Sequence, residues 1–103
     1  MYDPPLPLEE CLKALANPVR LKILHDLREP ERNFPGQEHP YDWGVCANKI
    51  ECSCNLSQST VSAHLAVLHQ TGLVTAKKVG QWIFYQRDEA AISKFFASLK
   101  DNL

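Results

Sequence analysis

The stretch LSQSTVSAHLAVLHQTGLVTAKKVGQWIFYQR, residues 56–87, changes its hydrophobic period halfway along. In its first half, apolar residues recur at helical spacing. They are Val61, Leu65 and Leu68. Ser57 is a favourable N-cap and Gly72 follows the last turn, so a helix is predicted over about 57–71.

The second half of this stretch is rich in β-branched and aromatic residues. Gly80-Gln81 lies between two such runs and suits a two-residue turn. Two strands, over about 73–79 and 82–87, are therefore predicted to pair as a β-hairpin.

Another helix is expected just before this stretch. Asp42 can cap it, and it would run from Trp43 to about Cys52. Two helices joined by a short turn and followed directly by a hairpin make a helix-turn-helix over about 43–71 with a wing over about 73–87.

Two more helices are predicted nearer the N-terminus. Apolar residues at helical spacing favour the first over about residues 7–16. Asn17-Pro18 is typical of an N-cap followed by proline at the first helical position, which begins the second helix, and Pro30 ends it near Arg28. Residues 29–43 hold three prolines and show no period, so they predict an exposed loop.

A last helix is expected over about 89–100, with Asp88 as its N-cap. The sequence therefore predicts a mainly α fold, a winged helix-turn-helix of five helices with the β-hairpin between the fourth and the fifth. With 103 residues, of which 45% are hydrophobic, the chain is long enough for one domain over 1–103 and too short for two.

The solvent face of the helix over 57–71 carries small and polar groups. The candidate DNA-binding residues on it are Ser57, Gln58, Ser59, Thr60, Ser62, Ala63 and His64. A helix fits the major groove, small groups let it approach base edges, and free N–H groups at its N-terminus attract a phosphate. On the hairpin, Lys77 and Lys78 beside Gly80 and Gln81 can reach the DNA backbone. Taken singly, these features are equally typical of a capped surface helix and a lysine-protected edge strand, but their order along the chain favours DNA binding.

The net charge of −1 argues against a protein that coats nucleic acid indiscriminately. The charges are unevenly distributed, because no Asp or Glu occurs between Asn55 and Arg87, whereas Lys77 and Lys78 lie within that stretch. One surface of the protein could therefore approach a polyanion.

Several motifs in a fixed order resemble those of the ArsR/SmtB family of bacterial repressors. ALANPVRLKIL (residues 14–24) resembles the family's opening motif. LSQSTVSAHL (56–65) resembles its recognition helix, followed by TGLV (71–74) and the wing end GQWIFY (80–85). The resemblance implies homodimers whose first and last helices pack together and which leave operator DNA when an inducer binds. The chain departs from the pattern at Ala63, where the family often has a basic residue, and in its longer connection between the second and third helices.

Two apolar stripes, one near each end of the chain, predict dimerisation. Their residues are Leu8, Cys11, Leu12 and Leu15 in the first helix, and Ile92, Phe95, Phe96 and Leu99 in the last. Some of them must pack in the chain's own core, but a chain this short cannot easily hide both stripes, so pairing across a two-fold axis is expected. Two recognition helices about 34 Å apart would then read an inverted repeat in double-stranded operator DNA.

Four cysteines in a chain without a signal peptide favour reduced thiols or metal ligands over disulfides. Cys46, Ile50 and Cys54 recur every four residues, which is typical of one buried helix face. Cys52 points elsewhere and is the better candidate for an exposed thiol. If the helix ended before it, Cys52 and Cys54 could offer two thiolates to a thiophilic metal or metalloid ion, with Cys11 among the further candidate thiols.

The resemblance bears on the sensor site as well. The metalloid-sensing branch of the family opens this helix with a Cys-Val-Cys pair, of which Cys46 matches the first position while Asn48 occupies the second, so that site is not intact. The family's other common metal site uses Asp and His residues in the last helix, and residues 89–103 contain no histidine, so that site is expected to be absent. Oxidation of Cys52 is the other mode of sensing that the sequence leaves open.

The leading hypothesis is a homodimeric transcriptional repressor, and the alternative is a thiol-based metal-binding or redox protein that uses the winged fold for protein contacts. An enzyme is not expected, because no motif places a histidine beside a cysteine and no glycine-rich phosphate loop occurs. No apolar run is long enough to cross a bilayer, and Met1–Leu8 lacks the features of a signal peptide. A cytoplasmic location with no membrane partner is therefore expected.

Overall fold

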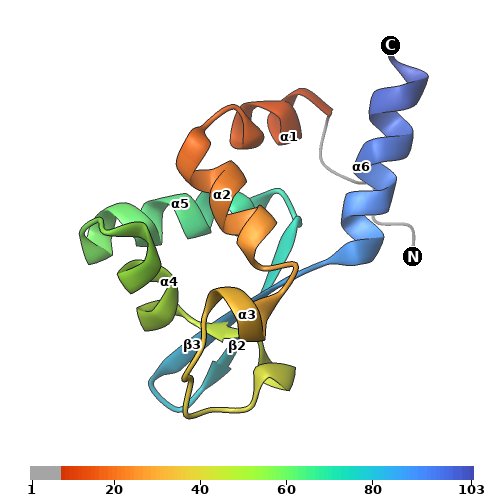
Figure 1. The fold of residues 1–103 in the computed structure, drawn as a ribbon. Helices are drawn as coiled ribbons and strands as arrows, with labels where there is room; N and C mark the ends of the chain where they lie inside the picture. Colours follow the sequence, from red (N-terminus) through yellow and green to blue (C-terminus); the bar gives the residue numbers. More distant parts are fainter. Residues whose placement is uncertain (1–7) are drawn as a thin grey trace.

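The computed structural model describes residues 8–103, whose elements follow one another as labelled in Figure 1. In chain order they are α1 (Leu8–Leu15), α2 (Pro18–Asp26), α3 (Pro30–Asn33), the 3₁₀ helix η1 (Tyr41–Trp43), β1 (Val45–Cys46), α4 (Ala47–Cys54), α5 (Gln58–Gln70), β2 (Val74–Val79), β3 (Trp82–Arg87) and α6 (Glu89–Asp101). The first seven residues of the expected domain, including residue 7 of the expected first helix, lie outside the described residues.

Three predicted helix N-termini are confirmed, those of α2, α5 and α6. The side chains of Asn17, Ser57 and Asp88 accept hydrogen bonds of 2.9 to 3.3 Å from backbone N–H groups in the first turn of each helix. Pro18 occupies the first turn of α2, where its missing N–H leaves no intrahelical bond unmade. Local sequence signals therefore fix where these helices begin.

The hairpin is also confirmed, and a third strand extends it. In the antiparallel order β1-β3-β2, the pair Val79–Trp82 closes the two-residue turn. Gly44 precedes β1 at φ +107, and a Cβ placed on it would lie 2.7 Å from the carbonyl oxygen of Tyr85. Glycine is therefore required where the chain meets the edge of β3.

The expectations for residues 29–46 are corrected in three respects. α2 ends at Asp26, and Pro30 begins the short helix α3 instead of merely following α2. The segment is not an exposed loop throughout, since Phe34 is buried in the main core. The next long helix begins at residue 47 and not at 43, with neither an Asp42 cap nor any other side-chain cap, because the two residues of β1 pair with β3. Pairing between residues about 40 apart outweighs the local helical pattern there.

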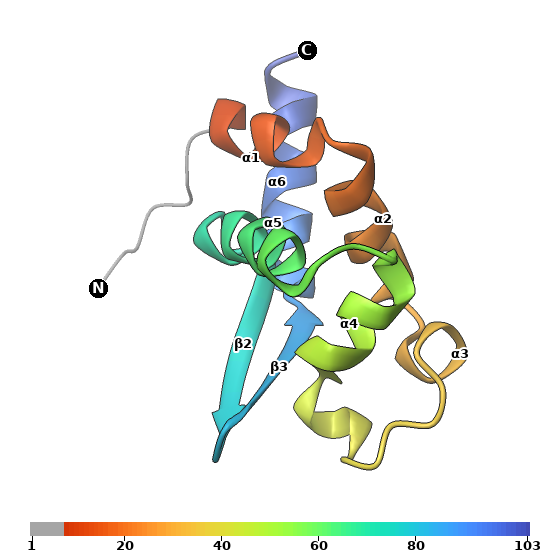
Figure 2. The same cartoon turned by 90° about the vertical axis from the view of Figure 1, so that its left-hand side faces the viewer.

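Most of the buried apolar residues form one main cluster, to which every long helix contributes. Val61, Leu65 and Leu68 of α5 are at most 1% exposed, as their spacing predicts. Figure 2 shows α5 beside α4, with the β2–β3 hairpin projecting from the end of α5, so the core holds these three elements in a fixed arrangement. None of the helices within residues 8–103 has the length and apolar character needed to cross a membrane.

Candidate nucleic-acid interface

A tight turn joins α4 to α5. Asn55 ends α4 in the left-handed conformation, at φ 54 and ψ 39, and Ser57 caps α5 two residues later. Asparagine is the residue other than glycine that most readily adopts this conformation, so Asn55 is a stop signal that the sequence analysis missed. The two helices pack on each other and form the predicted helix-turn-helix.

The N-terminal half of α5 presents the predicted polar face to solvent. The exposed members of that set are Ser57, Gln58, Ser59, Thr60, Ser62 and Ala63. The hydroxyl of Ser57 lies 2.8 Å from that of Thr60 and 3.3 Å from that of Ser59. The first intrahelical bond of α5 runs from the N–H of Val61 to the carbonyl of Ser57, so the amides before Thr60 point out of the helix end. A phosphate or a base edge can approach all of these groups.

His64 differs from the rest of this set, because it is half-buried against α2. Arg20 Nη1 lies 3.1 Å from His64 Nδ1, and the same guanidinium donates to the carbonyls of Ala14 and Lys13 at 2.5 and 3.3 Å. A guanidinium only donates, so His64 Nδ1 accepts and the imidazole carries its proton on Nε2. His64 therefore links α5, through Arg20, to α1 and α2, and it is less exposed than the rest of the set.

The two wing lysines lie on opposite faces of the hairpin. Lys77 pairs with Phe84 and Lys78 with Ile83, and both lysines are exposed, as are Gly80 and Gln81 at the tip. Lys77 Nζ lies 5.7 Å from the ring centroid of Trp43, whereas Lys78 projects from the other face. Basic groups therefore flank the wing on both sides.

Arg87, the third base of the acid-free stretch, has a structural role. Its Nη1 donates to the carbonyl of Leu24 at 3.1 Å, and its Nε lies 2.8 Å from Glu89 Oε2. The hydrogen bond from Arg87 lowers the pKa of the Glu89 carboxyl. Because these contacts occupy the guanidinium, the positive charge of the wing comes from its two lysines.

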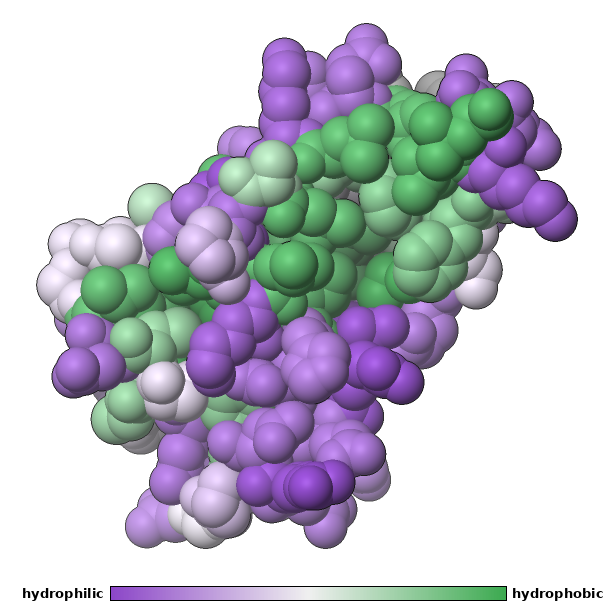
Figure 3. Space-filling view, turned by 45° about the horizontal axis from the view of Figure 1, so that its top comes forward, coloured by the Kyte–Doolittle hydropathy of each residue, from purple (hydrophilic) through white to green (hydrophobic). Residues whose placement is uncertain are grey.

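The predicted dimerisation residues separate into two groups. Cys11, Ile92 and Phe95 are buried in the chain's own core, and Leu8, Leu15 and Leu99 are half-buried against it. Leu12 and Phe96 remain 41% and 62% exposed, and Leu21, which the sequence analysis did not select, is 52% exposed. Figure 3, in which the side of α1 and α6 comes forward, shows a continuous apolar surface across the molecule. Six of the eight predicted residues therefore pack in or against the core of the monomer, and an apolar face that includes the other two is left outside it.

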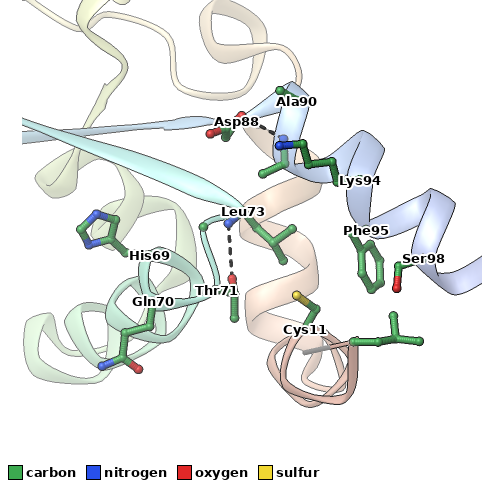
Figure 4. A pocket seen from close by; sticks show the side chains of 13 residues that line it. Cys11, His69, Gln70, Thr71, Leu73, Asp88, Ala90, Lys94, Phe95 and Ser98 are labelled. Carbon is green, nitrogen blue, oxygen red and sulfur yellow. Dashed lines mark hydrogen bonds between the residues drawn. The ribbon is translucent and has the colours of Figure 1, made fainter. Parts of the chain in front are cut away.

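A cavity of about 410 Å³ opens between α1, the end of α5 and α6. In Figure 4, Cys11, Leu73 and Phe95 form its apolar wall, and Lys94 and His69 lie toward its rim. Burial, together with the charge of Glu10, raises the pKa of the Cys11 thiol above its ordinary value, which keeps that thiol protonated. This cavity adjoins both the recognition helix and the helices expected to dimerise.

All four thiols are free, but their positions differ. Cys46 is buried, Cys52 is exposed as predicted, and Cys54 is half-buried against the core. Cys46 lies in β1 and not in the helix, so its burial does not follow from the helix face that the spacing predicts. The helix does not end before Cys52, since α4 continues through Cys54, so these two thiols, two residues apart, leave different faces of it. The condition on which the shared metal site depended is therefore not met, and residues 8–103 hold no cluster of three or more His, Cys, Asp or Glu placed for a metal ion.

The helix-turn-helix and its hairpin also match known proteins. A family model described as "Bacterial regulatory protein, arsR family" matches residues 45–76. YbzH of Bacillus subtilis, an uncharacterized HTH-type transcriptional regulator, is 40% identical over 96 residues, which are 91% of this chain and 96% of YbzH. The HTH-type transcriptional repressor SmtB of Mycobacterium tuberculosis is 32% identical over 75% of this chain, and the matched part is 47% of SmtB.

HlyU of Vibrio cholerae, a transcriptional activator, is similar in both sequence and structure. It is 39% identical over 74 residues, which are 72% of this chain and 56% of HlyU. Its solved structure superposes with a TM-score of 0.61 at 29% identity, covering 89% of this chain and 87% of that one. The match thus extends beyond the helix-turn-helix to most of the chain.

Proposed function

Because the chain belongs to the ArsR/SmtB family, and is thus a DNA-binding transcriptional regulator with a winged helix-turn-helix fold, we propose that it is a homodimeric repressor that an inducer releases from operator DNA. The observation that carries this proposal is the exposed N-terminal face of α5, with its hydroxyl groups, outward amides and flanking wing lysines. Binding to operator DNA implies a cytoplasmic location.

On the DNA, the first turns of α5 enter the major groove. Ser59 and Thr60 are small enough to let the helix approach base edges, and the amides at its N-terminus bind a phosphate. Lys78 and the wing tip at Gly80 and Gln81 contact the backbone beyond the groove. Ala63 adds no charge, so affinity depends on the helix end and the wing more than on a basic recognition helix.

The apolar face supports a dimer. Three large apolar side chains remain exposed on it, Phe96, Leu21 and Leu12, and a contiguous apolar patch is typical of a protein–protein contact. Pairing through α1 and α6 across a two-fold axis would cover this face and set two α5 helices one DNA turn apart, which fits an inverted repeat.

Repression, as opposed to activation, is supported by the similarity to SmtB, which is described as a repressor, although HlyU is described as an activator. For the inducer, the arrangement of α4 favours thiol oxidation at the exposed Cys52 over a metal shared by Cys52 and Cys54. The cavity in Figure 4 adjoins both α5 and the two helices proposed to dimerise, so a structural change in the cavity would affect both.

The test is a fluorescence-anisotropy titration of the reduced protein against DNA from upstream of its own gene. We expect a dimer-stoichiometric complex that weakens steeply between about 50 and 200 mM salt, because each phosphate contact adds about −0.9 to the salt slope. Ser59→Glu should abolish the complex and leave the dimer folded, since a carboxylate would face phosphate. No complex at micromolar dimer, or normal binding by Ser59→Glu, would refute the proposal.

A further inference from the structure

The β-sheet of the wing has two covered faces, and the second is not covered by the main core. Side chains alternate along a strand, so Val74 and Tyr85 face the helical core while Lys77, Trp82 and Phe84 face the other way. Phe84 on this outer face is nevertheless completely buried. Some other part of the chain must cover it.

The cover comes from the connection between α3 and β1. The His39 ring lies 5.2 Å from that of Phe84, 5.5 Å from Trp82 and 5.8 Å from Trp43, all between centroids. Trp43 meets Phe84 edge-on at 5.3 Å. These four rings form a second, small core on the outer face of the wing, to which aromatic pairs add directional contacts.

The covering segment is itself held in place at both ends. Gln37 Nε2 donates to the carbonyls of His39 and Gly44 at 3.1 Å each, and Gln37 Oε1 accepts from the N–H of Cys46 at 2.8 Å. Phe34 at its start is buried in the main core, and β1 at its end pairs with β3. The segment therefore has little freedom to move relative to the sheet that it covers.

One wing lysine is attached to this small core. Lys77 Nζ lies 5.7 Å from the centroid of Trp43, a cation–π distance, whereas Lys78 on the opposite face has no aromatic partner among the described residues. We propose that residues 34–46 form a brace for the wing, and that Trp43 and His39 are positioning residues that set DNA affinity by orienting Lys77 toward a phosphate. This inference rests on the proposed DNA-binding function. An ammonium that is already oriented loses less conformational entropy when it contacts DNA.

A double-mutant cycle measured by DNA anisotropy tests the coupling. Trp43→Leu, which keeps apolar volume and removes the ring, should weaken binding about five- to tenfold, and Trp43→Phe should restore most of it. On the Lys77→Gln background, Trp43→Leu should have little further effect, whereas on the matched Lys78→Gln background its full effect should remain. Independent effects with Lys77→Gln, or no rescue by Trp43→Phe, would overturn the assignment.

Hydrogen exchange of the free protein tests the brace without DNA, so it separates failure of the brace from failure of the proposed function. Trp43→Leu should speed amide exchange in β2 and β3 about tenfold or more while α5 stays unchanged. If Trp43→Leu does not fold, His39→Leu replaces it, with the same expectation. Unchanged exchange in the wing would refute the brace even where DNA binding is normal, and faster exchange without any DNA binding by the wild type would refute only the proposed function.

Discussion

Replacing a glutamine by glutamate at the N-terminus of α5 should weaken DNA binding and stabilise the fold, whereas the same replacement at its C-terminus should leave DNA binding nearly unchanged and destabilise the fold. Gln58 is the first residue of the helix and Gln70 the last, and both side chains are exposed. Gln58→Glu and Gln70→Glu therefore make the same chemical change on the same helix, and differ only in their distance from the bound DNA.

The magnitudes follow from the positions. A carboxylate at residue 58 about 6 Å from a phosphate would be repelled by about 0.7 to 2.8 kcal/mol, for an effective dielectric constant between about 80 and 20. Two half-sites double this repulsion to about 1.4 to 5.6 kcal/mol, so the dimer should bind DNA about ten- to ten-thousandfold more weakly. Residue 70 lies about 18 Å farther along the helix axis. That exceeds the Debye length of about 8 Å at physiological salt, so Gln70→Glu should change affinity less than about threefold.

The free energy of unfolding should change in the opposite direction from DNA affinity for Gln58→Glu. A negative charge at the N-terminus of a helix stabilises it by about 0.3 to 1 kcal/mol, and one at the C-terminus destabilises it by a similar amount. Gln58→Glu should therefore be the more stable variant and the weaker DNA binder. Urea denaturation and anisotropy on the same preparations measure both quantities. Normal DNA binding by Gln58→Glu, or equal losses in both variants, would show that α5 does not enter the groove by its N-terminus.

Of four further predictions, one concerns the dimer, one the wing and two the thiols. Phe96→Glu should raise the dissociation constant of the dimer at least about thirtyfold in analytical ultracentrifugation. The protomer should stay folded, because Phe96 is 62% exposed in the single chain. An unchanged dissociation constant would show that the dimer does not form through this apolar face. Phe84→Ala should lower the free energy of unfolding by about 3 to 5 kcal/mol, and Ile83→Ala, which alters a 37% exposed neighbour, by under about 1 kcal/mol; equal urea midpoints would contradict the second core. Because the pKa of Cys11 is raised in the folded chain, the unfolded chain loses that proton first, so stability should fall as the pH rises through the ordinary thiol range, and Cys11→Ala should flatten this trend. Cys52 should react first with a thiol reagent in the native protein, and faster labelling of Cys11 would contradict the structure.

The sequence predicts the elements whose signals are local. Asn17, Ser57 and Asp88 begin helices where their capping chemistry requires, and Gly80-Gln81 forms the predicted turn. The apolar spacing of α5 likewise separates its buried face from the exposed face that we propose contacts DNA. These decisions depend on residues within about four positions of one another, which a single sequence displays directly.

The predictions from sequence fail where the structure of a segment depends on residues far from it in the chain. Val45 and Cys46 form a strand because β3 offers an edge about 40 residues away, and without that edge they would extend the helix as the pattern suggested. Similarly, Phe34 and Trp43 made residues 29–43 unusually aromatic for an exposed loop, a signal that the count of prolines obscured. The sequence does not tell which apolar residues of α6 pack in the core and which stay exposed. Phe95 is buried and Phe96 exposed, and the two differ only in which part of the fold lies opposite each side chain.

The guanidinium of Arg20 determines which parts of the protein can move independently. By holding the last carbonyls of α1 and the imidazole of His64 together, it fastens α1, α2 and α5 into a single rigid body. α5 therefore cannot move alone without breaking the hydrogen bonds that join Arg20 to α1 and to His64. In the repressor dimer that we propose, release from an operator would therefore proceed by a change in the spacing or tilt of the two protomers relative to each other, and not by movement of α5 within one protomer.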